Sequence, residues 1–212
     1  MAKARSLAPE QLRALGRIAK LPGIDRFYLA GASAITWHLG HRRSRDLDLF
    51  SIDLNVSLER LQWATRRERG VQVIEATESA VALKVGSIPV DLVRYPYPPL
   101  ETPAPGPLEF PVAGLRDLAA MKLAAIARRG LRRDFWDLYE LAHAGVPIRE
   151  AAYCYVQRFG TTAADVYHVQ RALTWFEDAE RDPRAVAGLS AKRWDRIKTF
   201  FRAETPSLLD DV

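Results

Sequence analysis

The chain has 212 residues, of which 48% are hydrophobic and 27% charged, a composition typical of one large globular domain or two small ones. Its single cysteine, Cys154, excludes an intramolecular disulfide and fits a reducing cytoplasm. No apolar run approaches the length of a membrane span, and the N-terminus lacks the apolar core of a signal peptide. We therefore expect a cytoplasmic protein that does not use a membrane.

The net charge of +5 is distributed unevenly along the chain. Residues 1–95 contain 15 Lys and Arg against 10 Asp and Glu, whereas residues 96–212 contain 16 of each kind. A basic first half favours a polyanionic partner such as a nucleotide or RNA. A general surface bias explains so small an excess as well.

The first 95 residues predict a small mixed α/β unit. Apolar periodicity, glycine stops and a hairpin turn at Gly86-Ser87 divide it into elements. Helices are expected at Leu7–Leu21, Ala32–Leu39 and Ser57–Arg69, and strands at Arg26–Ala30, Asp46–Ser51, Val71–Ala76, Ala80–Val85 and Ile88–Tyr95.

The second half has a different character. Seven of the 13 prolines lie between Pro96 and Pro111, which argues against a helix or a central strand there and predicts an interdomain connector. Helical periodicity follows, with a tail from Pro206 that is expected to fray. The expected helices are Leu115–Arg128, Arg133–Ala144, Ile148–Arg158, Thr162–Glu180 and Ser190–Ala203. We therefore predict an α+β protein with an α/β domain over residues 1–95, a connector over 96–112 and a helical domain over 113–212.

A small-residue turn, Gly31-Ala32-Ser33, joins a predicted strand to a predicted helix. Such a turn can cradle a phosphate at the helix N-terminus, with Gly31 permitting close backbone approach and Ser33 donating to a phosphate oxygen. An ordinary strand-to-helix turn with Ser33 as a capping residue explains the same residues, and for the turn alone it is the more frequent case.

Two carboxylates, Asp46 and Asp48, alternate with apolar residues in the next predicted strand. Side chains two residues apart on a strand point to the same face, so the two can share metal ions, and Mg²⁺ prefers such oxygen ligands. The alternative is a solvated strand face paired with Arg43 or Arg45. The apolar residues around the aspartates favour the metal site.

A third carboxylate, Asp91, lies inside the apolar run Ile88–Val93. It could complete a three-carboxylate metal site or act as general base on an attacking hydroxyl. It could equally be a charge on an edge strand, which Pro89 would suit.

Lys122 falls inside the apolar stripe of its predicted helix. A buried lysine needs an anionic partner, such as a triphosphate or a nearby aspartate, unless the side chain snorkels along the stripe. Asp134 and Asp137 open the following helix, where negative charge suits the helix dipole. Asp134 could reach the same site as Lys122, and a structural salt bridge to Lys122 or Arg133 explains it as well.

Two basic clusters could bind phosphate or an RNA backbone, although solvated loops have the same composition. The Trp and Tyr residues are assigned mostly to the core. The first cluster includes Arg42 and Arg43, and the second consists of Arg128, Arg129, Arg132 and Arg133.

Taken in order, these motifs resemble the AbiEii/AbiGii toxin family of the nucleotidyltransferase superfamily, which has a DNA polymerase β-like fold. The superfamily pattern is a Gly-Ser pair, roughly ten residues and then Asp-x-Asp, which the spacing of Gly31–Ser33 and Asp46–Asp48 fits. The strand around Asp91 resembles the third-carboxylate strand. Residues 117–130 and 133–139 resemble the family's later lysine and Asp-x-x-Asp motifs.

The resemblance implies a nucleotidyltransferase-fold mixed sheet with flanking helices, followed by a helical bundle. It implies transfer of a nucleoside monophosphate from an NTP to a hydroxyl, with Mg²⁺ or Mn²⁺ and with release of pyrophosphate. Family members are toxins of toxin–antitoxin or phage-defence pairs, and some add nucleotides to tRNA 3′ ends, so an RNA acceptor and an antitoxin partner are implied. The implied metal ligands are Asp46, Asp48 and Asp91, with Asp91 also activating the acceptor, and the implied nucleotide-binding residues are Gly31, Ser33, Arg42, Arg43, Lys122 and Asp134, of which Lys122 neutralises phosphate charge.

One residue departs from the family pattern. The family usually has Gly-Gly before its Ser or Thr, and here the second position is Ala32. Two alternatives therefore stay open: a catalytically degenerate binding or regulatory module, and nucleotidyl transfer to a small molecule or a protein.

Overall fold

A computed structural model describes residues 7–206, which divide into two compact units with their boundary between Gly114 and Leu115. Unit 1 combines a sheet with helices, and unit 2 is helical, so the predicted α+β class is confirmed. None of the described helices is both long and apolar enough to cross a membrane. The fraying predicted beyond Pro206 concerns residues 207–212, which lie outside the described residues.

Unit 1 is built on a mixed sheet with the strand order β3-β4-β5-β2-β1-β7-β6. β2 runs antiparallel to β1 and parallel to β5, while β3, β4 and β5 form an antiparallel meander. The strands are β1 (Tyr28–Ala30), β2 (Leu47–Ser51), β3 (Val71–Ala76), β4 (Ala80–Val85), β5 (Ile88–Arg94), β6 (Ala104–Pro105) and β7 (Pro111–Val112).

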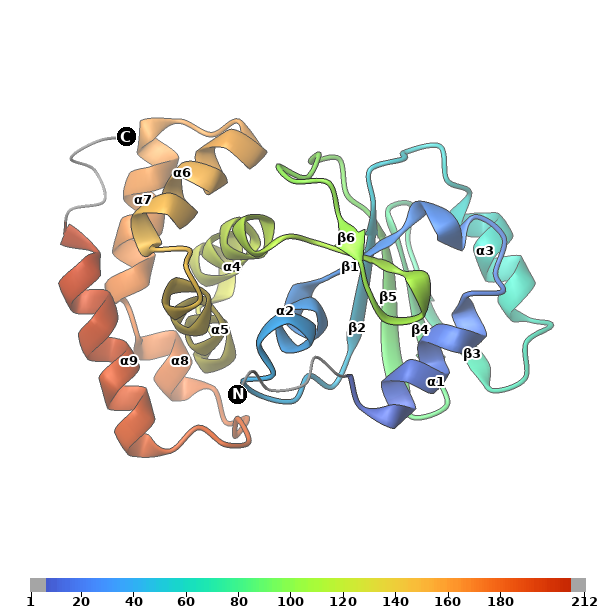
Figure 1. The fold of residues 1–212 in the computed structure, drawn as a ribbon, viewed down its shortest axis with the longest axis horizontal. Helices are drawn as coiled ribbons and strands as arrows, with labels where there is room; N and C mark the ends of the chain where they lie inside the picture. The colour runs from blue at the N-terminus through green and yellow to red at the C-terminus, as the bar shows by residue number, and fades with distance from the viewer. Residues whose placement is uncertain (1–6, 207–212) are drawn as a thin grey trace. The chain divides into compact units, whose positions relative to one another are not determined.

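The helices of unit 1 cover both faces of this sheet, with α2 on one face and α1 and α3 on the other (Figure 1). Along β2, Leu47 and Leu49 are fully buried, and Asp48 between them points to the opposite face. The sheet therefore buries its leucines on one side and presents its carboxylates on the other. The helices are α1 (Pro9–Ile18), α2 (Gly31–Leu39) and α3 (Leu58–Thr65), with short 3-10 helices η1 (Ile24–Arg26) and η2 (Pro107–Glu109).

Unit 2 is organised around α4, which packs against α5, α6 and α7. An aromatic cluster of Phe135, Phe176, Trp194 and Phe201 fills part of its core, with ring centroids 5.2–5.9 Å apart. The helices are α4 (Leu115–Arg129), α5 (Arg132–His143), α6 (Ile148–Phe159), α7 (Ala163–Thr174), α8 (Glu177–Arg181) and α9 (Ala191–Glu204).

The single helix predicted over Thr162–Glu180 is wrong, because two helices occupy it. The chain leaves helical geometry at Trp175, where ψ is 102°, and α8 starts two residues later. Neither Gly nor Pro marks the break. Phe176 is instead buried against Phe135 and Trp194, so tertiary packing sets the break and the local sequence does not.

The proline-rich stretch was expected to hold no helix and no central strand, and this is wrong as well. It carries η2 and two short strands, and β7 lies between β1 and β6. Pro111 is tolerated because the hydrogen bond to β1 is donated by Ala113, the residue after β7, whose N–H bonds the Leu29 carbonyl at 2.9 Å. Pro111 supplies no donor to that pairing.

Smaller differences concern single residues. Pro89 does not mark an edge, because β5 lies between β4 and β2. Its missing N–H is harmless because pairing with β2 begins one residue later, at Val90. Arg26 belongs to η1, α3 ends at Thr65, and Asp46 lies one residue before β2.

Candidate active site

The N-terminus of α2 lies directly against a carboxylate of β2. α2 begins at Gly31, whose φ is +59°, a left-handed value that favours glycine. A Cβ built on Gly31 would lie 2.0 Å from Oδ2 of Asp48, so a side chain there would displace the carboxylate. The glycine therefore allows Asp48 to reach the first turn of the helix.

Ser33 follows in the same turn and is fully buried. Its hydroxyl donates to the carbonyl oxygen of Ala30 at 3.2 Å. The expectation that Ser33 caps the helix is wrong, because Ala30 is the N-cap and no side chain bonds there. To donate to a phosphate oxygen, the hydroxyl hydrogen would have to turn away from Ala30.

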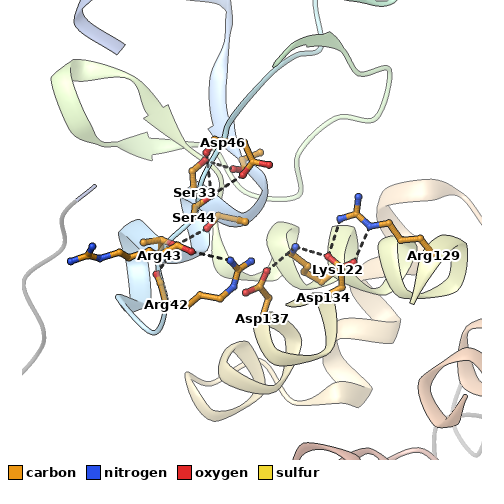
Figure 2. A network of polar contacts seen from close by, with 12 residues as sticks. Ser33, Arg42, Arg43, Ser44, Asp46, Lys122, Arg129, Asp134 and Asp137 are labelled. Carbon is orange, nitrogen blue, oxygen red and sulfur yellow. Dashed lines mark hydrogen bonds and ion pairs between the residues drawn. The ribbon is translucent and has the colours of Figure 1, made fainter. Parts of the chain in front are cut away.

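Side-chain hydrogen bonds fix the basic loop between α2 and β2 near both of its ends (Figure 2). The Thr36 hydroxyl donates to the carbonyl of Arg42 at 3.2 Å, and the Ser44 hydroxyl donates to Oδ1 of Asp46 at 2.9 Å. Arg43 is exposed, and neither Arg43 nor Arg45 forms an ion pair within residues 7–206. The alternative that these arginines neutralise the aspartates is therefore wrong.

Three carboxylates, which we call the sheet carboxylates, gather in unit 1: Asp46, Asp48 and Asp91. Asp48 and Asp91 are register partners in the parallel strands β2 and β5, and all three are half-buried. Burial raises the pKa of Asp91 above its ordinary value, and the negative charge of Asp46 raises it further. No ion pair to Asp46 or Asp91 occurs in the described part of the chain.

The chemistry of the sheet carboxylates is compatible with a divalent cation that a substrate helps to bind. Residues 7–206 contain no group of three His, Cys, Asp or Glu side chains that could hold a metal by themselves. Mg²⁺ in nucleotide sites typically takes one or two carboxylates and completes its shell with phosphate oxygens and water. The donors here are hard oxygen ligands, and the repulsion that Asp91 feels from Asp46 is what a cation would relieve.

Unit 2 contains a second set of charged groups, Lys122, Asp134 and Asp137 with the exposed Arg129, which we call the buried quartet because three of its four members are buried (Figure 2). Lys122 Nζ lies 3.0 Å from Oδ1 of Asp134 and 2.8 Å from Oδ2 of Asp137. Arg129 donates to both oxygens of Asp134, at 2.9 and 3.0 Å. Both aspartate side chains are 0% exposed and that of Lys122 is 7% exposed.

The pKa values in the quartet follow from this pairing. Burial disfavours the charge of Asp134, but Lys122 and Arg129 outweigh burial and hold the pKa of Asp134 below its usual value. Burial likewise disfavours the charge of Lys122, yet Asp137 and Asp134 raise the pKa of the lysine above its usual value. Lys122 and Asp134 therefore both stay charged at neutral pH.

This geometry decides between the alternatives for Lys122. The lysine is paired with aspartates, so snorkelling is wrong, and the salt-bridge partners of Asp134 are Lys122 and Arg129, with no bond to Arg133 among the described ion pairs. The role of Lys122 and Asp134 towards a nucleotide stays a prediction.

The assignment of most Trp and Tyr residues to the core is wrong for several of them, since the exposed side chains include Trp63, Tyr97, Tyr153, Tyr167 and Trp175. Trp175 and Tyr167 are each 51% exposed and line a pocket of unit 2 together with Arg128 and Arg171. The signal in the sequence was a helical one. Tyr167 and Arg171 are four residues apart, on a side of α7 that does not contain Val166, Val169 and Leu173, which are its buried apolar residues.

Comparison with known proteins supports the same fold. MenT4, a nucleotidyltransferase toxin from Mycobacterium tuberculosis H37Rv, has a similar structure, with a TM-score of 0.61 and 20% identity over 95% of this chain and 82% of that one. JHP933 from Helicobacter pylori is similar with a TM-score of 0.52 and 15% identity, covering 97% of this chain and 96% of that one. An uncharacterized protein of Aquifex aeolicus strain VF5 is 29% identical over 98% of this chain and its own full length.

A family profile gives the assignment. The profile described as "Nucleotidyl transferase AbiEii toxin, Type IV TA system" matches residues 64–212, a stretch that includes Asp91 and the buried quartet. Ser33, Asp46 and Asp48 lie before it, and the structural similarity to MenT4 extends over 95% of the chain. The chain therefore belongs to the family of AbiEii nucleotidyl transferase toxins of type IV toxin–antitoxin systems, and it is a nucleotidyltransferase.

Proposed function

We propose that the protein transfers a nucleoside monophosphate from an NTP to a hydroxyl of RNA, at the 3′ end of a tRNA, with Mg²⁺ or Mn²⁺. Membership of the family implies an NTP substrate, a divalent metal in general and an antitoxin partner. The observation that carries the proposal is the meeting of three elements in unit 1. Gly31 opens α2 against the Asp48 carboxylate, and Asp48 is in register with Asp91 on the adjacent strand.

Each of these residues has a role that its position supports. The first backbone N–H groups of α2 have no acceptor within the helix, so with Ser33 they can donate to phosphate oxygens. Asp46 and Asp48 would hold the metal against the triphosphate, and Asp91 would hold metal or accept the proton of the acceptor hydroxyl. The hydroxyl oxygen then bonds to the α-phosphorus while the bond to pyrophosphate breaks.

The metal, when bound, supplies neutralisation of the charge that develops on the phosphate oxygens. Because Mg²⁺ and Mn²⁺ both accept carboxylate ligands, the donor set does not choose between them.

RNA as the acceptor is supported by charge. The excess of basic residues lies in residues 1–95. In the basic loop between α2 and β2, Arg43 is exposed and lies three residues before Asp46. An RNA backbone next to the sheet carboxylates would be repelled by them unless such positive groups compensated.

The test is incubation of the protein with each labelled NTP, Mg²⁺ and total RNA, with detection of labelled RNA. We expect label in tRNA with at least one NTP, complete loss in Asp48→Ala and no loss in Asp25→Ala, since Asp25 is an exposed carboxylate of the same unit. Label in a small molecule or protein and none in RNA would refute the acceptor. Tight NTP binding that needs no Mg²⁺ and survives Asp46→Asn, without transfer, would support the degenerate module that Ala32 suggested.

A further inference from the structure

A pocket of about 670 Å³ lies within unit 2 and is assigned no role by the activity proposed above. The last turn of α4 forms one wall, and the outer side of α7 with the residues after it forms the other. Its volume is in the range that accommodates a nucleotide-sized ligand. The side chains that matter here are Arg128, Arg171, Tyr167 and Trp175.

The pocket has positive charge to offer. Arg128 and Arg171 are exposed, and neither forms an ion pair anywhere within residues 7–206. Arg129, which also lines the pocket, differs because both oxygens of Asp134 already engage it. One carboxylate, Asp178, lines the pocket as well, so the pocket has two guanidinium groups without an ion pair and a single negative charge. Guanidinium groups suit phosphate, which they can bind through two parallel hydrogen bonds.

Two carbonyls near the end of α4 have partners. Ring nitrogen Nε2 of His168 lies 3.3 Å from the carbonyl oxygen of Ala127, and the N–H of Gly130 donates to Ala125 at 3.4 Å. The contact with His168 reduces the negative potential at this end of the helix, and the arginines must outweigh the rest for an anion to bind.

Two aromatic rings stand beside these arginines. Trp175 and Tyr167 are each half exposed, while the buried side of α7 consists of aliphatic residues, so the rings add little to the core. Arg171 Nη1 lies 3.5 Å from the Tyr167 hydroxyl oxygen, which brings one cation next to one ring. Stacking surfaces combined with phosphate-binding cations are the usual means of binding single-stranded nucleic acid.

We propose that this pocket binds a nucleotide of single-stranded RNA, with the base stacked on Trp175 and the adjoining phosphates bound by Arg128 and Arg171. The identity of the strand as RNA rests on the proposed function. An acidic protein segment would use the arginines but would have no need of exposed rings, so the rings favour nucleic acid.

The experiment measures binding of a short fluorescent single-stranded RNA by anisotropy, without NTP or Mg²⁺, over a series of salt concentrations. Trp175→Leu should weaken binding about tenfold without changing its salt dependence, because it removes stacking and no charge. Arg128→Gln and Arg171→Gln should each reduce the slope of log K against log salt by about 0.7, the value for one lost phosphate contact on a single strand.

Unit 1 offers a matched control. Trp63 is 54% exposed and the guanidinium of Arg67 lies 4.0 Å from its ring centroid, so this pair has the same chemistry outside the pocket. Trp63→Leu and Arg67→Gln should leave RNA affinity and its salt slope unchanged. Equal losses in the two sets would overturn the proposal in favour of general charge attraction.

Other outcomes also overturn it. Arginine variants that lose affinity while Trp175→Leu does not would indicate a simple anion site, open to an acidic protein segment. If free NTP displaced the RNA completely and bound with the same dissociation constant as the RNA, the pocket would be a mononucleotide site. Asp48→Ala separates the two proposals, because it should lose transfer and keep RNA binding. Normal RNA binding by all the pocket variants would refute the pocket and leave the proposed transfer untouched.

Discussion

The two acidic sites of this protein differ in what balances their charge. In unit 1 the sheet carboxylates are half-buried, and Asp46 raises the pKa of Asp91 by repulsion. In unit 2 the two aspartates of the buried quartet are fully buried, and Lys122 and Arg129 match them charge for charge. A second pair in unit 2, Arg158 with Asp117, is also completely buried and matched.

The difference separates groups that hold the fold together from groups that need a ligand. A charge removed from water costs several kcal/mol unless a partner compensates it, so a buried site must be neutral within itself. Asp46 and Asp91, which form no ion pair within residues 7–206, can stay unbalanced because water still solvates half-buried carboxylates, but they gain from any cation that binds. We therefore expect substitutions in the quartet to affect stability and those among the sheet carboxylates to affect activity.

The largest effect is expected from Lys122→Met. It would leave Asp137 without its lysine and Asp134 with Arg129 alone, at a cost of about 3–5 kcal/mol in the free energy of unfolding. Urea denaturation measures it. The control is Lys198→Met, because Lys198 pairs with the half-exposed Glu180 and should contribute about 1 kcal/mol or less.

The same variant would contradict the division into structural and functional charges if Lys122 acts mainly on the nucleotide. In that case Lys122→Met would unfold in urea like the wild type and would bind NTP much more weakly. That outcome would return Lys122 to the phosphate-binding role that the family resemblance implies.

Asp48→Asn should have the next largest effect, and this effect should be on activity and not on stability. If Asp48 binds the metal as proposed, its loss should reduce nucleotidyl transfer by on the order of a thousandfold, whereas the free energy of unfolding should change little because the side chain is only half-buried. Transfer assays and urea denaturation on the same preparation test this. A variant that loses stability and activity in parallel would show that the sheet carboxylates are structural too.

Gly31→Ala tests the close contact between α2 and Asp48. The new Cβ would displace the Asp48 carboxylate, which should slow transfer by about a hundredfold, the scale for misplacing a catalytic group by an ångström. Gly86→Ala is the matched control, because Gly86 has a φ of +62° and open space around it. Both variants should lose about 1 kcal/mol of stability from the left-handed backbone. Gly31→Ala should lose more because of the contact with Asp48, and Gly86→Ala should keep its activity. Equal activity of the two would contradict the contact.

Local signals predicted much of the fold. The strands Val71–Ala76 and Ala80–Val85 have the predicted bounds, because β-branched residues and the Gly86-Ser87 turn determine them. The break at Trp175 and the strand β7 could not be predicted, since each depends on partners distant in sequence. The helix breaks where Phe176 packs against Trp194, and β7 forms by pairing with Leu29 of β1.

The site shows the same limit. The apolar stripe around Lys122 indicated that it needs an anion, but only the fold shows that Asp134 and Asp137 supply it. Likewise, Gly31 was identified as a close-approach glycine, yet the group that approaches, Asp48, follows from pairing of β1 with β2. Sequence identified which residues carry chemistry, and tertiary contacts identified their partners.

The smallest effect is expected in the pH dependence of the quartet. Because the pKa of Asp134 is lower in the folded state than when unfolded, its stabilisation is present above the unfolded value near 4 and is lost as the pH falls through the folded value. The wild type should therefore lose more unfolding free energy than Lys122→Met between pH 7 and 3, by about 1 kcal/mol. Lys122 affects stability at the other end of the pH range. Because its pKa is raised, its stabilisation is fully present at lower pH and is lost only above about pH 10.5. Urea denaturation from pH 3 to pH 11 measures both effects. A difference in unfolding free energy between wild type and Lys122→Met that stays constant from pH 7 to 3 would mean that the lysine does not hold Asp134 in its charged form.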